Sequence, residues 1–216
     1  MVKLNPYLKI MRSSAIMAVV MILFLGFIIP SITAEIAEHI DPGSAMGSPV
    51  EINGKVYGSY LLAEAFNNSS LFFQARPSVT SYNLSESGSC TGSGDSSQSL
   101  NFTLKALREF ESKNPGVNLS SIPFAMIAYS ASGLDPNIPV EGAYIQIPRI
   151  ASNLSILFNG SLSISVFESD LMQYINSSEQ QNFPIFGSYY TNTMVLNVDI
   201  INLMIKNGVV PKSLLD

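Results

Sequence analysis

The sequence predicts an α+β domain, an ectodomain anchored by one N-terminal transmembrane helix. Three observations predict this class: one long uncharged stretch near the N-terminus, enough chain after it for one ordinary domain, and helix and strand patterns that follow no regular βαβ rhythm. We expect residues 1–12 to form a cytoplasmic tail, residues 13–36 a transmembrane helix and residues 37–216 an extracellular domain.

The apolar stretch from Ser13 to Ala34 contains 22 residues and no charged side chain. A helix of this length spans about 33 Å, against a hydrocarbon core of about 30 Å. Its length exceeds the roughly 7–15 apolar residues of a signal peptide, which favours an uncleaved anchor, although the small residues before Ala34 also fit a cleavage site. Pro30 lacks an amide hydrogen, which predicts a bend in the outer half of the helix.

The charges on either side of this stretch predict its orientation. Lys3, Lys9 and Arg12 precede it, and only acidic residues follow it closely. Because basic residues remain in the cytoplasm, the N-terminus is expected inside and the domain outside the cell membrane. Eight glycosylation sequons, where composition alone gives roughly three, support this location. The sequons begin at Asn67, Asn68, Asn83, Asn101, Asn118, Asn153, Asn159 and Asn176.

The composition of the predicted outer part excludes several classes of function. Eight basic residues stand against 16 acidic ones, a net charge of −8. This charge argues against nucleic acid and against a domain lying on anionic lipid, so membrane lipid is expected only around residues 13–36. Cys90 is the single cysteine and His39 the single histidine, so neither an internal disulfide nor a tetrahedral Cys/His metal site is expected.

Local patterns predict the elements of the domain. Residues 50–57 alternate around Asn53-Gly54, which is typical of a hairpin with a type I′ turn. Pro148 should kink or end the helix that begins near Pro139. Helices are expected over residues 60–66, 100–112, 121–128, 139–151, 162–175 and 200–206, the last capped by Asp199, and strands over 71–78 and 195–198.

The most distinctive motif lies in residues 129–151. It reads S-x-S-G-L-D-P-x-I from Ser130, followed by a proline-initiated helix with A-x-x-Q-x-P-R-x-A from Ala143. This pattern resembles that of the KdpC family. Its members are a component of the potassium-transporting P-type ATPase known as the Kdp complex. The resemblance extends over residues 13–204, because further family patterns occur in order. They are Gly58-Ser59, Phe73–Ser78, Asn114-Pro115, Val195–Val198 and Ile201–Leu203.

Two stretches depart from the family pattern. The family loop that usually reads S-G-G-S-N is replaced by Thr91–Asp95, and residues 152–183 match poorly. The glycines of residues 88–94 do not form a phosphate-binding loop, because Asp95 stands where a lysine would follow. A flexible loop is the favoured interpretation of this stretch.

The resemblance implies a non-catalytic subunit of a high-affinity, ATP-driven potassium importer. It implies partners, a P-type ATPase subunit and a channel-like potassium-binding subunit, and a role in assembling or stabilising their complex. It also implies a catalytic chaperone that raises the ATP affinity of the pump subunit. No cofactor is expected on this chain alone, and ATP binding only together with the pump. Since ATP is inside the cell, an extracellular domain would have to act on it through helix packing in the membrane.

The candidate site residues come from these motifs. An aspartate and an arginine among them are expected to pair structurally, and Gln146 to bond the backbone of residues 130–135. Arg76 and Arg149 could instead lie at a partner interface, where arginine is enriched. The candidates are Arg76, Pro77, Ser78, Ser130, Ser132, Gly133, Leu134, Asp135, Gln146, Pro148 and Arg149.

Two other classes of function, and one further role for the charge, stay open. A hydrolase would use Ser130 or Ser132, but no lysine lies near either in sequence and His39 stands beside the membrane. A stand-alone extracellular binding module would need no partner subunit. The acidic surface could also concentrate cations over a pore, which would weaken uptake only at low salt when the acids are removed.

Overall fold

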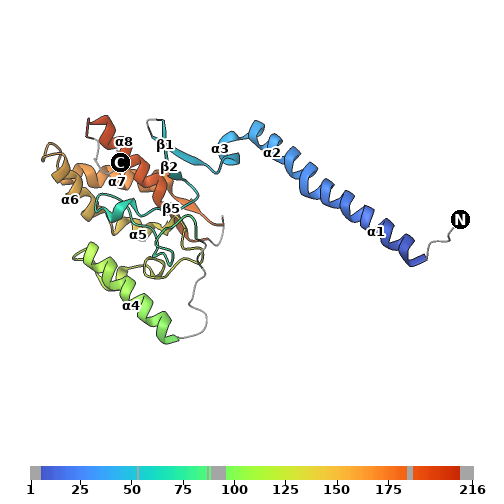
Figure 1. Ribbon diagram of the computed structural model, residues 1–216. Helices are drawn as coiled ribbons and strands as arrows, with labels where there is room; N and C mark the ends of the chain where they lie inside the picture. Colours follow the sequence, from blue (N-terminus) through green and yellow to red (C-terminus); the bar gives the residue numbers. More distant parts are fainter. Residues whose placement is uncertain (1–5, 53, 87, 89–95, 184–186, 210–216) are drawn as a thin grey trace. The chain divides into compact units, whose positions relative to one another are not determined.

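The computed structural model describes residues 6–52, 54–86, 88, 96–183 and 187–209. The predicted flexible loop lies outside these ranges over residues 89–95. The chain forms two compact units, Met1–Pro49 and Val50–Asp216 (Figure 1). The second unit carries helices and two small sheets, which confirms the predicted α+β class.

The first unit is one long helix followed by a short turn. Helix α1 (Pro6–Leu23) continues through the π-helical turn η1 (Phe24–Ile28) into α2 (Ile29–Ile40). The stretch from Tyr7 to Ile40 is long and apolar enough to cross a membrane. The expected disturbance by Pro30 takes the form of this π turn, because a wider turn accommodates a residue that cannot donate. The helix ends at Asp41, whose side chain caps the short helix α3 (Pro42–Ala45).

The second unit contains two antiparallel sheets. Strands β1 (Pro49–Ile52) and β2 (Lys55–Ser59) pair as the predicted hairpin, with Gly54 between them at a φ of +79°. The other sheet has the order β3-β5-β4, and Ile138 faces Thr191 across the β3–β5 pair. Its strands are β3 (Asn137–Pro139), β4 (Gln180–Gln181) and β5 (Tyr189–Asn192).

Five α-helices of the described residues complete this unit, and Figure 1 shows α4 set apart from α6, α7 and α8. They are α4 (Ser96–Lys113), α5 (Val140–Tyr144), α6 (Ile147–Leu157), α7 (Ile164–Ser178) and α8 (Thr193–Lys206). Pro148 lies in the first turn of α6, so the predicted break of the 139–151 helix is confirmed. The core lies around α6, α7 and α8, whose apolar faces bury Leu154, Phe167 and Leu196 completely.

Several predicted elements are wrong. Residues 195–198 lie inside α8 instead of a strand, because the Asn192 side chain, not Asp199, caps the helix through the amides of Met194 and Val195. A short, mostly apolar run fits a strand or a buried helix equally well. Residues 71–78 form no strand, and 60–66 no α-helix, since only the 3₁₀ turn η2 (Phe66–Asn68) begins there. Residues 121–128 hold the end of the 3₁₀ turn η3 (Leu119–Ser121) and the 3₁₀ turn η4 (Phe124–Met126) instead of a helix.

Candidate functional site

Arg149, on α6, donates five hydrogen bonds inside the domain. Its Nε donates to Asn114 Oδ1 at 2.9 Å, and both Nη atoms donate to the carbonyl oxygen of Phe72 at 3.1 Å. Nη1 also donates to the Ser70 carbonyl at 2.6 Å, and Nη2 to Gln146 Oε1 at 2.8 Å. Every one of these acceptors is a neutral oxygen. Burial lowers the pKa of Arg149 to about 10, which still leaves the guanidinium charged near neutral pH.

Two buried amide side chains hold the same segment. Asn197 on α8 accepts from the Phe73 amide at 2.7 Å and donates to the Phe73 carbonyl at 3.0 Å. Gln146 accepts from the Gln74 amide at 2.8 Å and donates to the Gln74 carbonyl at 3.2 Å. Each amide therefore satisfies both backbone groups of one residue, as a neighbouring strand would.

We call these four side chains, Asn114, Gln146, Arg149 and Asn197, the clamp. They fix an irregular stretch of backbone to α6 and α8, which explains why residues 71–75 can be buried without a sheet. The prediction that Gln146 bonds residues 130–135 is wrong, since its partners are Gln74, Gly142 and Arg149.

The second arginine makes a different contact. Arg76 Nη1 lies 3.2 Å from Asp135 Oδ2, and Nη2 donates to the Tyr129 carbonyl at 3.4 Å. The two charged side chains are 25% and 31% exposed, so water reaches this pair. The other carboxylate oxygen, Oδ1, accepts from the Asn137 amide at 3.0 Å. The expected pairing of an aspartate with an arginine is confirmed by Arg76 and Asp135, whereas Arg149 pairs with no acid among the described residues.

Residues 130–135 form a tight turn, here called the serine turn. The Ser130 amide donates to the Pro77 carbonyl, and Ser132 Oγ accepts from the Leu134 amide at 3.1 Å. Gly133 has a φ of +75°, and a Cβ there would lie 2.9 Å from Thr80 Oγ1. Both the backbone conformation and the close approach therefore require glycine at this position. The hydroxyl of Ser132 is used to shape the turn.

Ser78 and Tyr82 hold together the loop of residues 76–82, which lies next to the serine turn. Ser78 Oγ accepts from the amides of Thr80 and Tyr82, at 3.2 and 3.0 Å. The Tyr82 hydroxyl donates to the Arg76 carbonyl at 2.8 Å. Burial, with smaller contributions from Glu109 and Tyr129, raises the pKa of Tyr82 to about 12, so the phenol stays neutral.

Six of the candidate residues line two open grooves. One, of about 790 Å³, is lined by Arg76, Ser132, Leu134 and Asp135 together with the 60%-exposed Leu61. We call it the motif groove. The other, of about 660 Å³, is lined by Pro148 and Arg149 among others. Gln146 is fully buried, and its side chain connects the start of α6 to the backbone of Gln74.

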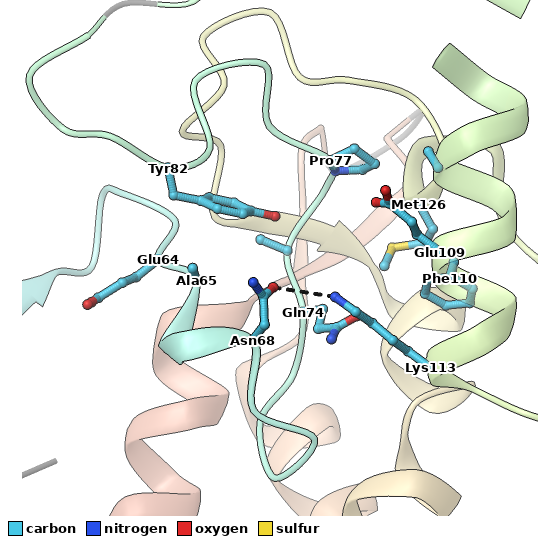
Figure 2. Close-up of a pocket in the computed structure, with 12 residues that line it drawn as sticks. Glu64, Ala65, Asn68, Gln74, Pro77, Tyr82, Glu109, Phe110, Lys113 and Met126 are labelled. Atoms are coloured by element: carbon cyan, nitrogen blue, oxygen red, sulfur yellow. Dashed lines mark hydrogen bonds between the residues drawn. The ribbon is translucent and has the colours of Figure 1, made fainter. Parts of the chain in front are cut away.

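A third hollow is a small pocket beside α4 (Figure 2). Its volume of about 70 Å³ is room for a few water molecules at most, against about 300–1,000 Å³ for ligand pockets. Lys113 and Asn68 meet across it at 3.4 Å, and Glu64 lies on the opposite side (Figure 2). Partial burial raises the pKa of Glu64, although the residue as a whole is exposed. Within the described residues no group of three or more His, Cys, Asp or Glu side chains could hold a metal.

Sequence reasoning missed three residues of this network: Asn114, Asn197 and Tyr82. Asn197 is buried completely, and Asn114 is 2% exposed. A signal for Asn197 was present, since one asparagine interrupts an apolar run, but the strand assignment hid its position on the buried face of a helix. Asn114 was noted only as part of the Asn114-Pro115 pair of the family pattern.

Comparisons with known proteins cover nearly the whole chain. Residues 11–202 match the family model KdpC, described as the K⁺-transporting ATPase c chain. A potassium-transporting ATPase KdpC subunit of Thermoplasma acidophilum is 51% identical over 97% of this chain and 99% of its own length. The protein of the same name from Thermoplasma volcanium is 52% identical over 89% and 91% of the two chains. One from Caldanaerobacter subterraneus is 30% identical over 84% and 89%.

Proposed function

The chain belongs to the KdpC family of K⁺-transporting ATPase c chains, and from this premise we propose that it is a non-catalytic, membrane-anchored subunit of a potassium-importing ATPase complex. The observation that carries the proposal is the family match over residues 11–202, which includes the apolar helix and the clamp. The partners are then the ATP-hydrolysing subunit and the channel-like potassium-binding subunit of the same complex.

The long helix is the proposed anchor in the cell membrane. It carries Lys9 and Arg12 near its start, and Glu35 and Glu38 near its end. Under the positive-inside rule this arrangement places residues 1–12 in the cytoplasm and the α+β domain outside. Lipid surrounds residues 13–36, and helix packing against partner subunits connects the two sides of the membrane.

The motif groove is the proposed contact surface on the domain. Leu61 exposes an apolar side chain there, and the Arg76–Asp135 pair supplies polar partners at its wall. Apolar contact surrounded by satisfied polar groups is the usual composition of a subunit interface. The clamp keeps the segment that carries Arg76 in one conformation before the partner arrives, which lowers the entropy cost of assembly.

The chaperone role is proposed to act without nucleotide on this chain alone. A domain outside the membrane is separated from cytoplasmic ATP, so its effect on the ATP affinity of the pump subunit must travel through the membrane helices.

Affinity purification tests the assembly proposal. A tag after Asp216 would be used to isolate the chain from native membranes in mild detergent. We expect an ATPase subunit and a channel-like membrane protein to co-purify with potassium-stimulated ATPase activity. The variant Leu61→Glu should lose these partners, whereas Ile156→Glu, at a 75%-exposed position on α6, should keep them. A chain that purifies alone would overturn the proposal and leave a stand-alone binding module.

Cysteine labelling tests the orientation. In a Cys90→Ser background, a cysteine at Ile156 or at Lys9 gives one labelling site in each unit. A membrane-impermeant maleimide added to intact cells should label Ile156→Cys and leave Lys9→Cys unlabelled until the membrane is opened. The reverse pattern would place the domain in the cytoplasm.

A further inference from the structure

None of the eight sequon asparagines belongs to the clamp or the serine turn, and none lines the motif groove. All eight asparagines lie in the described residues, and seven are exposed. The exception is Asn153 on α6, which is only partly exposed. Its Nδ2 donates to the Arg149 carbonyl at 2.8 Å, and its Oδ1 accepts from Ser70 Oγ at 3.1 Å.

Asn118 shows the opposite arrangement. It precedes the 3₁₀ turn η3 (Leu119–Ser121), and its Oδ1 accepts from both the amide and the hydroxyl of Ser120, at 3.1 and 2.9 Å. The side chain of the asparagine and the hydroxyl of the sequon therefore already meet. Its Nδ2 has no hydrogen-bond partner among the described residues. Asn159, in the turn after α6, is exposed and its side chain makes no hydrogen bond to the described residues.

We propose that the domain is N-glycosylated at its exposed sequons, first of all at Asn118 and Asn159, and left unmodified at Asn153. The inference rests on the proposed extracellular location, because glycan transfer to sequons takes place on exported segments. The number of sequons supports it, since composition alone gives roughly three and the chain has eight.

The chemistry explains why Asn153 differs from an exposed site such as Asn118. A transferase would join Asn118 Nδ2 to the anomeric carbon of an oligosaccharide carried on a lipid pyrophosphate. The bond from that carbon to the pyrophosphate oxygen breaks, the lipid pyrophosphate leaves with the electron pair, and the amide loses one proton. The nitrogen must reach the transferase for this step. At Asn153 it is held by a helix carbonyl on a packed face, whereas at Asn118 it is available.

The positions of the sequons are compatible with the proposed contact surface. The motif groove is lined by no sequon asparagine, whereas Asn68 lines the small pocket and Asn153 the Arg149 groove. Bulky glycans would therefore cover other parts of the domain and leave the motif groove open to a protein partner.

Glycopeptide mass spectrometry of the chain from native membranes tests the proposal. Trypsin releases residues 114–149 as one peptide, whose only sequon is Asn118. We expect this peptide to carry a glycan mass that fragments to hexose or related sugar ions. The longer peptide 150–206 holds Asn153, Asn159 and Asn176, and cuts after Phe158 and Phe167 separate the three. We expect a glycan on the fragments with Asn159 and Asn176 and none on the fragment with Asn153.

Matched variants separate glycosylation from folding. Asn118→Gln and Ser120→Ala should both remove the glycan from peptide 114–149, whereas Ser120→Thr and Ser121→Ala should keep it. Asn153→Gln should leave every glycan mass unchanged. Bare Asn118 and Asn159 peptides from a domain that the maleimide labels outside would overturn this inference and leave the proposed function standing. Failure of the orientation itself would instead appear as labelling of Lys9→Cys alone.

Discussion

The segment from Ser70 to Ser78 is held at its two ends by different chemistry. At the buried end the backbone of residues 70–74 bonds the guanidinium of Arg149 and the neutral carboxamides of Gln146 and Asn197. At the outer end Arg76 pairs with a carboxylate, and Pro77 accepts from the serine turn. The same residue type, arginine, thus meets carbonyls where it is buried and an acid where water reaches it.

The difference follows from the cost of removing charge from water. A buried ion pair needs two charges desolvated, whereas Arg149 brings only one and satisfies its donors with carbonyls that also needed partners. At Arg76 water reaches part of both side chains and screens the pair in part, so the acid costs less to place there than in the core and the pair contributes less than a fully buried one. The inner end should therefore determine stability, and the outer end should be adaptable.

Replacing the buried arginine is the strongest test of this contrast. Arg149→Met leaves the carbonyls of Ser70 and Phe72 without donors, and we expect a loss of about 3–5 kcal/mol in the free energy of unfolding. Urea denaturation of the full chain in mild detergent, followed by circular dichroism, measures it. Arg108→Met, at an exposed position on α4, is the control. Similar small losses in both variants would show that the clamp does not determine stability.

The amide of Asn197 should come next in size. Asn197→Ala removes both partners of the Phe73 backbone groups in a fully buried site, so we expect a loss of about 2–4 kcal/mol. Asn202→Ala changes an exposed asparagine of the same helix and should stay within about 0.5 kcal/mol. The same urea series decides the point, and equal losses in the two variants would contradict it.

Gly133 tests the outer end through its backbone. Gly133→Ala adds the strain of positive φ and a contact with Thr80, for an expected loss of about 2 kcal/mol. Gly116→Ala has a similar φ, +84°, but open space around the new methyl, so it should lose about 1 kcal/mol. The difference between the variants isolates the contact. Thr80→Ala should restore part of it, and a failure to do so would place the cost elsewhere.

The ion pair should be worth less again. A double-mutant cycle with Arg76→Met and Asp135→Asn should give a coupling of at most about 1 kcal/mol, because both side chains are partly exposed. Added salt should reduce that coupling further. A coupling above about 3 kcal/mol, insensitive to salt, would mean that Arg76 behaves like Arg149 and that the two ends do not differ.

The sequence predicted the parts of this arrangement that depend on local signals. The Asn-Gly hairpin, the helix of Leu104 and Phe110, and the break at Pro148 follow from turn chemistry, apolar spacing and a missing donor. Arg76, Asp135 and Arg149 were singled out as candidates, and the expectation that an aspartate pairs with an arginine holds for Arg76 and Asp135.

The clamp could not be predicted in the same way. Its contacts with residues 70–74 join residues 72 to 124 positions apart, and no local pattern says that Asn197 will bond Phe73. The buried stretch 71–75 has the composition of a strand, but side-chain amides replace the neighbouring strand, so propensity gave the wrong element. Asn192 was likewise hidden as a cap because the following apolar run fits two structures.

The smallest expected effect concerns Glu64, which lines the small pocket together with Pro77 and Tyr82. It is the only one of these predictions that depends on pH. Partial burial raises the pKa of this carboxyl above its usual 4.5 in the folded chain, so the unfolded chain ionises first as pH rises. The stabilising effect of the neutral acid is therefore present below about pH 4.5 and is lost as pH rises through the folded pKa. Glu64→Gln keeps the side chain neutral, so near pH 7 it should be more stable than the natural chain.

The size of that gain should be below about 0.5 kcal/mol, because solvent screens a largely exposed carboxylate. It should shrink as pH falls through 4.5 and be small near pH 4, where the natural side chain is mostly protonated in both states. Glu111→Gln, on the exposed face of α4, is the control and should show no such difference between the two pH values. A gain that persists at pH 4 would show that the amide makes a new contact. The effect would then come from packing of the amide and not from the charge of the carboxylate.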